Sequence, residues 1–463
     1  MKVRVLLYLM VLIILIILLL YITSSSSSIY SLNRLATLGL LYVLYLVFDS
    51  LDPRYSNFTV YNDWFKLSDT NLPIIYIQLL LVIILLIYTT VNQRYFLQST
   101  WVYPIILFNL LGLLLFPIVN DMLLLYIIIE LQSYSLYILT GIHHKSYNST
   151  RGSMLYFVTG GIASIGILVA IYMVYNLIGT CNITEISNYY TIHNINNIFD
   201  PIDILIISLI FKMGLAPLHS WSIAVYNYAP TYITAYISIV AKISILSWIY
   251  INANLVHLDI IILIFIISIA IAGYKPLFQV NIKTILAYSG ILNFGYLLIP
   301  VVLQDPAYYI YLIQYIITHM LIFLCLLASN KFIINPNSDW SPIVNVNQLI
   351  IPNRMLIFIL IICFLSLIGI PPLPGFYGKY YILVSLLHNN YTLESLSIII
   401  FSVIATYYYA YIIKQLASNY TRNMINEPIN NTLSIIISIL FVIFLGYYIY
   451  IFDMLNVINI ILS

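Results

Sequence analysis

The stretch Phe211-Lys212-Met213-Gly214-Leu215-Ala216-Pro217-Leu218-His219 places a lysine, a glycine and a proline inside a long apolar run. A similar stretch, Gly369-Ile370-Pro371-Pro372-Leu373, interrupts a second apolar run further along the chain. Proline removes a backbone donor and clashes with the preceding turn, so it breaks a helix and leaves carbonyl groups that need partners. The sequence therefore predicts two helices that are broken near their middle, at Gly214 and Pro217 and at Gly369, Pro371 and Pro372.

The composition around these stretches is that of a membrane protein. Of the 463 residues, 63% are hydrophobic and 7% are charged, whereas a soluble domain carries about 25% charged residues. A helix needs about 20 apolar residues to span a bilayer, and runs of this kind recur along the whole chain. The sequence predicts an all-α polytopic membrane protein with 14 transmembrane helices. They lie at about 3–23, 33–49, 73–91, 101–119, 121–142, 152–178, 201–228, 231–252, 256–273, 279–300, 306–330, 353–388, 393–417 and 432–452.

The connections between the predicted spans are short. The longest, near 49–72, 179–200 and 331–352, are polar and are expected to be loops. From the fourth span onward, eight Lys and Arg residues fall on one face of the membrane and none falls on the other. This asymmetry is typical of the matrix or cytoplasmic side. The first three spans do not follow the pattern.

The two broken helices indicate an internal repeat. They are the seventh and twelfth predicted spans, and an odd offset of five reverses the direction of a helix across the membrane. The chain is therefore predicted to contain two inverted five-helix repeats, spans 4–8 in segment 96–252 and spans 9–13 in segment 253–420. A three-helix segment, 1–95, precedes them, and a C-terminal helix, 421–463, follows. One broken helix is more often a packing kink, but two at matching positions point to a transport path.

Four charged side chains lie deep inside predicted spans, namely Glu130, Lys212, Lys242 and Lys379. Each costs about 2.5–3.5 kcal/mol to insert, so the four together cost on the order of 10 kcal/mol. Burial makes a lysine release its proton more readily, and a nearby carboxylate opposes this. The four residues therefore suggest a proton relay. A static ion pair between Glu130 and one lysine remains the alternative.

Two further features of the spans are a histidine and a group of small residues. His319, in the eleventh span, is either a relay group or a hydrogen-bonded core residue, since its ordinary pKa lies near neutrality. The small residues Gly160, Gly161, Ala163, Ser164 and Gly166 are interpreted as a ridge that lets helices pack closely.

Cys181, Cys325 and Cys363 are isolated, and no glycine-rich nucleotide motif, P-loop or His-Glu-x-x-His motif is present. We expect no cofactor or metal site in this chain.

Several of these stretches together resemble one protein family. Residues 211–221, Lys242, residues 283–289 and residues 369–379, in this order, resemble the antiporter-like subunits of respiratory complex I. The resemblance is greatest to the subunit type that has a lysine at the position of Lys379 and lacks a long C-terminal lateral helix. It implies that Glu130 is the glutamate of helix five, Lys212 its lysine partner, Lys242 the central lysine and Lys379 the lysine on the outlet side. His319 lies where the family places a lysine or histidine.

The resemblance also implies a function. We expect a proton-translocating membrane-arm subunit of NADH:ubiquinone oxidoreductase, driven by quinone reduction elsewhere in the complex. NADH, FMN, iron–sulfur clusters and ubiquinone would then belong to other subunits. The expected partners are the other membrane-arm subunits and lipids, with cardiolipin as a candidate. Nucleic acid is not expected, because the net charge is only +2.

The composition also suggests where in the cell the protein is found, and two alternative functions remain. The many Ile, Asn and Tyr residues (44 Tyr) suit an AT-rich genome, which suggests a mitochondrially encoded protein of the mitochondrial inner membrane. A stand-alone cation/proton antiporter and a scaffold with a vestigial channel are the alternatives.

Overall fold

The fold was analysed in a computed structural model. The structure describes residues 7–24, 29–49, 58–68, 70–89, 100–143, 146–193, 200–329, 332, 344–349, 351–419, 429 and 431–462. The chain forms two compact units. The first comprises Met1–Met213 and Val240–His257, and the second comprises Gly214–Ile239 and Leu258–Ser463.

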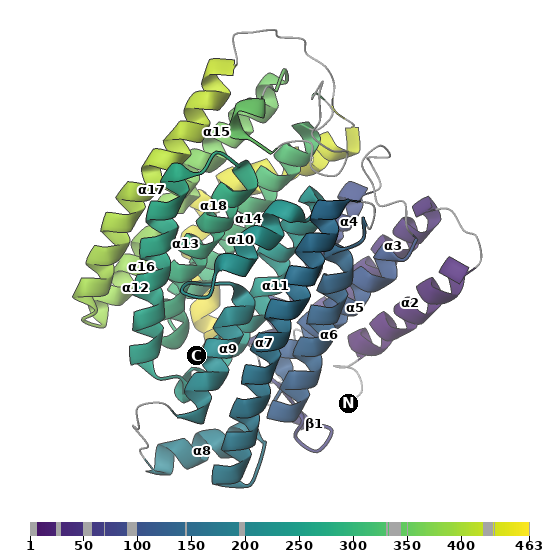
Figure 1. Ribbon diagram of the computed structural model, residues 1–463, viewed down its shortest axis with the longest axis vertical. Helices are drawn as coiled ribbons and strands as arrows, with labels where there is room; N and C mark the ends of the chain where they lie inside the picture. Colours follow the sequence, from purple (N-terminus) through teal and green to yellow (C-terminus); the bar gives the residue numbers. More distant parts are fainter. Residues whose placement is uncertain are drawn as a thin grey trace. The chain divides into compact units, whose positions relative to one another are not determined.

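The described residues of the first unit form helices and one β-hairpin (Figure 1). Its elements are α2 (Leu7–Ser24), α3 (Ile29–Asp49), β1 (Phe58–Val60), β2 (Phe65–Leu67), α4 (Asn71–Thr89), α5 (Val102–Leu115), the 3-10 helix η2 (Phe116–Ile118), α6 (Met122–Thr140), α7 (Tyr147–Ile178), α8 (Ile183–His193), α9 (Pro201–Met213), the 3-10 helix η3 (Ala253–Leu255) and part of α11 (Thr231–Ile251). Helix α6 packs against α5 and α7, and α7 packs against α9. Helix α7 therefore contacts both α6 and α9.

The second unit is a helical bundle. Its elements are α10 (Ser220–Tyr228), the first part of α11, α12 (Leu258–Tyr274), the 3-10 helix η4 (Lys275–Phe278), α13 (Ile282–Val302), α14 (Ala307–Ser329), the 3-10 helix η6 (Val346–Gln348), α15 (Arg354–Ile368), α16 (Pro374–His388), α17 (Thr392–Asn419) and α18 (Asn431–Leu462). Helix α14 packs against α13, α15, α16 and α18. Helices α13 and α14 are buried on nearly all sides, as expected for apolar helices inside a bundle.

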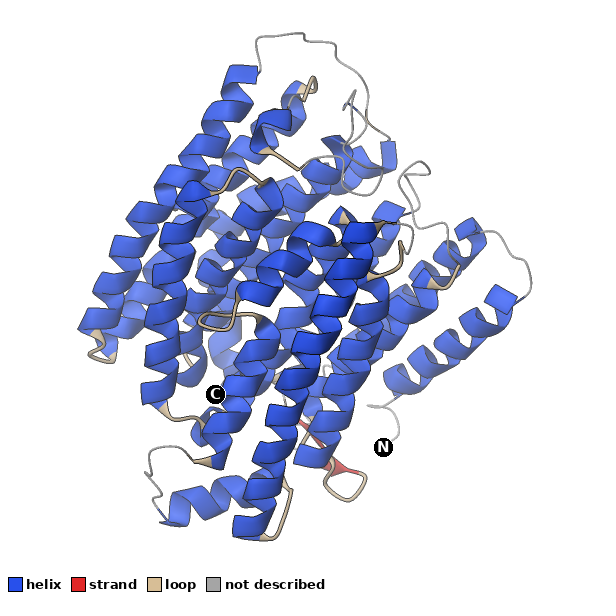
Figure 2. Cartoon of the chain, viewed as in Figure 1, coloured by secondary structure: helices blue, strands red, loops and turns tan. Residues whose placement is uncertain are grey.

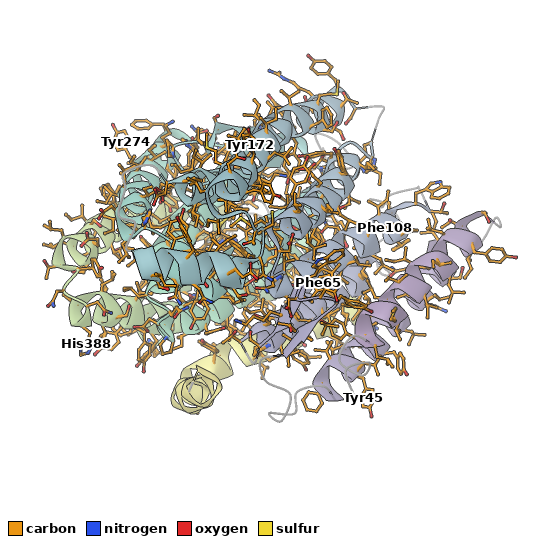
Figure 3. The ribbon with its side chains drawn as sticks, turned by 90° about the horizontal axis from the view of Figure 1, so that it is seen from below. Tyr45, Phe65, Phe108, Tyr172, Tyr274 and His388 are labelled. Carbon is orange, nitrogen blue, oxygen red and sulfur yellow. The ribbon has the colours of Figure 1, made fainter. Side chains whose placement is uncertain are left out.

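Among the described residues, nine helices are long and apolar enough to cross a membrane, and four shorter apolar helices accompany them. Exposed aromatic side chains project outward from helices of both units, including Tyr45, Phe108, Tyr172 and Tyr274 (Figure 3). In water such apolar surface would be costly, whereas lipid tails accept it. The prediction of an all-α polytopic membrane protein is confirmed at this level. The four-segment division stays a prediction.

Two of the connections expected to be plain loops contain regular structure. Residues 58–67 form an antiparallel hairpin, and α8 occupies part of the connection near 179–200 (Figure 2). The hairpin turns through Tyr61, Asn62 and Asp63, which all have positive φ. Asn and Asp tolerate this left-handed conformation. The hairpin is anchored to the end of η2, since Asn120 N–H donates to the carbonyl of Trp64 at 2.8 Å.

Candidate functional site

An ion pair connects α6 and α9 of the first unit. The Lys212 Nζ atom is 2.9 Å from Oε1 of Glu130, and both side chains are partly buried, with 8% of the Lys212 side chain and 13% of the Glu130 side chain exposed. Helix α6 carries Glu130, and its first turn is capped by Asp121, which accepts from the backbone N–H groups of Leu123 and Leu124. Helix α9 carries Lys212 in its last turn. The negative end of a helix dipole stabilises a cation at that position.

A serine of α7 also contacts the Glu130 carboxylate. The hydroxyl of Ser164 lies within hydrogen-bond reach of Oε1 of Glu130 and of the Gly160 carbonyl. The sequence interpretation assigned Ser164 to packing alone, and in this respect it was incomplete. The contact could not be found from spacing, because Glu130 and Ser164 lie on different helices. A hydroxyl donor stabilises the ionised form of the carboxylate.

The first interrupted helix ends directly after Lys212. Gly214 has φ +72°, which terminates α9, and the chain resumes as α10 at Ser220. A Cβ atom on Gly214 would lie 2.5 Å from the Cβ atom of Ser222, so no side chain fits there without a shift. Ser222 lies close because its hydroxyl is within reach of the carbonyls of Gly214 and His219. Pro217 lies between the two helices.

The second interrupted helix also has a lysine beside its break. Helix α15 ends at a left-handed Gly369 with φ +93°, and α16 begins at Pro374, so that Pro371 and Pro372 lie in the gap. The Lys379 Nζ atom donates to the carbonyls of Leu367 at 2.8 Å and Ile368 at 3.0 Å. The carbonyls freed by the break therefore bind the ammonium group, which also lies at the negative end of α15.

Lys242 and His319 lie in the interior of their helices. Lys242 is buried in α11, within the part that belongs to the first unit. His319 is fully buried in α14 of the second unit, and its ring lies 4.2 Å from that of Tyr315, centroid to centroid. The structure thus places Glu130, Lys212 and Lys242 in the first unit and His319 and Lys379 in the second.

A further lysine is buried that the sequence analysis did not count among the intramembrane charges. Lys283 follows the N-terminus of α13 and is 4% exposed. Its Nζ atom donates to the carbonyl of Ala229, the residue after α10, at 2.8 Å. Because Lys283 lies at the end of an apolar run, its position in the sequence did not indicate that it is buried. Like Lys379, it binds a carbonyl at the C-terminal end of a helix.

A charged cluster lies where α9 begins. The Nδ1 atom of His257 is 2.8 Å from Asp203 Oδ1, and its Nε2 atom is 3.7 Å from Asp200 Oδ2. Asp203 also accepts from the backbone N–H of Asp200 at 2.9 Å. Burial and the neighbouring Asp203 raise the pKa of Asp200, whereas His257 lowers it. The sequence analysis did not single out either aspartate.

Comparison with known proteins finds a family model and relatives whose descriptions agree with one another. The family model described as NADH:quinone oxidoreductase/Mrp antiporter, TM, matches residues 119–407. The curated protein "NADH-ubiquinone oxidoreductase chain 2" of Candida albicans is 57% identical over 411 residues, which cover 88% of this chain and 86% of that protein. The protein of the same name from Debaryomyces hansenii is 52% identical and covers 84% of this chain and 86% of its own length.

A solved structure shows the same fold. A chain in the structure titled "Respiratory complex I from Thermus thermophilus with bound Aureothin" superposes with a TM-score of 0.79. The match covers 97% of this chain and 98% of that chain, at 19% sequence identity. At this identity the likeness establishes the fold alone. The matched residues 119–407 include Glu130, Lys212, Lys242, His319 and Lys379.

Proposed function

We infer the function of this chain from its family, because it belongs to the NADH:quinone oxidoreductase/Mrp antiporter membrane subunits. It is an antiporter-like subunit of the membrane arm of respiratory complex I, and thus part of a proton-pumping NADH:ubiquinone reductase. Other membrane-arm subunits are its partners. Its fungal relatives and its apolar helices place it in the mitochondrial inner membrane as a multi-pass protein.

We propose fourteen spans with two inverted repeats. In this arrangement α9 with α10, and α15 with α16, each count as one interrupted span. The repeats are then α5, α6, α7, α9/α10 and α11, followed by α12, α13, α14, α15/α16 and α17. The matching positions of the two breaks, each beginning at a glycine with positive φ, support this division.

The proposed activity is proton translocation through five residues, of which Lys242 and His319 are buried and the other three are partly buried. Glu130, Lys212 and Lys242 act in the first unit, and His319 and Lys379 act in the second. The observation that carries the proposal is the Glu130–Lys212 pair, which lies beside a helix break and is buried from water. A pair that served stability alone would cost more than an apolar replacement of similar size.

The strength of this pair makes it suitable as a switch. Two unit charges about 4 Å apart attract each other by roughly 4 kcal/mol at an effective dielectric constant of about 20. Moving Lys212 away from Glu130 would remove most of this attraction, which favours the charged ammonium form of the lysine. Opening the pair would thus release a proton toward the next acceptor, and closing it would bind another. The break at Gly214 supplies the backbone freedom that such a movement needs.

Exchange of Glu130 for Gln tests the proposal in the assembled complex. We expect the Glu130→Gln complex to assemble and to oxidise NADH with an artificial acceptor, yet to lose quinone-driven proton translocation. Glu130→Asp, which keeps the charge, should retain part of the activity. Unchanged proton translocation in the Glu130→Gln complex would contradict the relay. Proton translocation that survives Lys242→Met in the same assay would favour a scaffold with a vestigial channel.

We also propose that the redox chemistry lies in other chains. The described residues contribute lysines, carboxylates and hydroxyls to the site, and these groups can bind and pass protons but cannot accept electrons from NADH. FMN, iron–sulfur clusters and ubiquinone would then be bound elsewhere in the complex. Purification of the complex followed by separation of its subunits tests this: flavin or iron that remained with this chain would contradict it.

A further inference from the structure

A row of aromatic side chains runs along α14 of the second unit. Tyr311, Tyr315 and His319 are spaced four residues apart, so they lie on one face of the helix. All three are at least 98% buried. The rings of Tyr315 and His319 lie 4.2 Å apart, centroid to centroid. The row therefore begins at one residue of the proposed relay.

The row continues across α13 to α16. The ring of Tyr296 on α13 lies 6.1 Å from that of Tyr311. The Lys379 Nζ atom on α16 lies 5.9 Å from the centroid of the Tyr296 ring. Helix α14 packs against both α13 and α16, which holds these residues together. The row therefore ends at the other relay residue of this unit.

The hydroxyl groups of this row are buried at an energetic cost. A buried hydroxyl without a hydrogen-bond partner costs about 1–3 kcal/mol. Among the described residues, the hydroxyls of Tyr296 and Tyr315 have no such partner. Phenylalanine would fill almost the same volume without this cost. Tyr8 on α2 shares this feature, so the position of Tyr296 and Tyr315 between His319 and Lys379 is what points to a role for them.

The third hydroxyl of the row is held by a polar network. Tyr311 donates to Oδ1 of Asn293 at 2.6 Å, and the Asn293 amide donates to the carbonyl of Ser289 at 2.8 Å. The hydroxyl of Ser289 is hydrogen-bonded to that of Tyr409 on α17 at 2.7 Å. Gly290 adds to the space near Tyr315, since a Cβ atom there would lie 3.4 Å from the Tyr315 hydroxyl. Polar atoms thus flank the row along α13.

We propose that the hydroxyls of Tyr315, Tyr311 and Tyr296, with water held between them, carry protons between His319 and Lys379. This inference rests on the proposed function and assigns further residues to it. A proton leaves an imidazolium nitrogen of His319, and an N–H bond forms at Nζ of Lys379. Each hydroxyl between them accepts a proton on a lone pair and releases its own, so it stays neutral and no oxidant or reductant is required. The carbonyls of Leu367 and Ile368 then stabilise the ammonium group formed.

The test removes the hydroxyls and keeps the rings. We expect Tyr315→Phe and Tyr296→Phe, combined in one complex, to slow NADH-driven proton translocation by about tenfold or more, as for loss of a proton-transfer group. Assembly and resistance to heat should fall little, because neither hydroxyl bonds to a protein group among the described residues. Tyr8→Phe is the matched control, since Tyr8 is also fully buried and its hydroxyl has no hydrogen-bond partner among the described residues. It lies on α2 of the first unit and should leave translocation unchanged.

The Glu130→Gln complex, assayed in parallel, separates this inference from the proposed function. If Glu130→Gln stops translocation and the double Tyr→Phe variant does not, the tyrosine row is not the path and the proposed function stands. If neither affects translocation, the proposed function is wrong as well. If the double variant and Tyr8→Phe slow translocation equally, the effect is general to buried tyrosines and the inference is overturned.

Discussion

The ammonium group of Lys379 donates to the carbonyl of Leu367 at 2.8 Å and so binds the end of the helix that breaks at Gly369. A carboxylate in its place could only accept hydrogen bonds and would face carbonyl oxygens. We therefore expect Lys379→Glu to lower the stability of the assembled complex by about 3–5 kcal/mol, the usual cost of breaking a buried charged interaction. The yield on native gels and the temperature of heat inactivation measure this.

Arginine at the same position serves as the control. Lys379→Arg retains a positive charge and several donors, although its guanidinium is larger and rarely gives up a proton. It should therefore assemble better than the Lys379→Glu variant but translocate protons poorly. Assembly of the Lys379→Glu complex at the wild-type level would show that the two carbonyl bonds contribute little to stability.

The Glu130–Lys212 pair allows stability and activity to be measured separately. Glu130→Gln leaves the Lys212 side chain without the carboxylate that stabilises its charge, which should lower the resistance of the complex to heat. Lys212→Met in the same chain removes this buried charge, so the double variant should recover most of the resistance to heat. Proton translocation should stay absent in both. A double variant that pumped at the wild-type rate would exclude both residues from the proton path.

Two neighbouring glycines on α7, Gly160 and Gly161, are suited to a comparison of alanine substitutions. A Cβ atom at Gly160 would overlap the hydroxyl of Tyr137, whose ring packs edge-on against Tyr156 and Phe157. At Gly161, nothing lies within 4 Å of the added atom. We expect Gly160→Ala to destabilise by about 1–3 kcal/mol through overpacking, and Gly161→Ala to change the free energy of unfolding by less than about 0.5 kcal/mol. Equal heat inactivation of the two variants would contradict the close packing of α6 on α7.

The length and apolar character of each run were sufficient to predict most helices. The expected span 306–330 corresponds to α14 at Ala307–Ser329, and the expected breaks fall between α9 and α10 and between α15 and α16. Other features had no signal in the sequence. Lys379 binds backbone carbonyls, which every residue has, so its partners could not be read from residue types. The contact of Ser164 with Glu130 depends on how α6 and α7 pack, and the hairpin at 58–67 lies in a segment without a clear alternation of polar and apolar residues.

The cluster at the start of α9 predicts a dependence of stability on pH. Burial raises the pKa of Asp200, so this carboxyl binds a proton more tightly in the folded chain than in the unfolded chain. Its favourable contribution is therefore present at low pH and is lost as the pH rises through the folded-state pKa. The groups around it are Asp203, His257 and Tyr190 on α8, and burial with the two aspartates raises the pKa of Tyr190 to about 12, so that it stays neutral.

Replacement of Asp200 by Asn measures this effect. Asparagine does not ionise, so the stability of the Asp200→Asn variant relative to the wild type should increase as the pH rises above about 4, the ordinary pKa of an aspartate. Heat inactivation of the purified complex at several pH values gives this difference. Glu185→Gln, at an exposed carboxyl on α8, is the control and should show no such trend. A variant that became less stable than the wild type as the pH rose would mean that the attraction of His257 for the Asp200 carboxylate outweighs the cost of burying that charge.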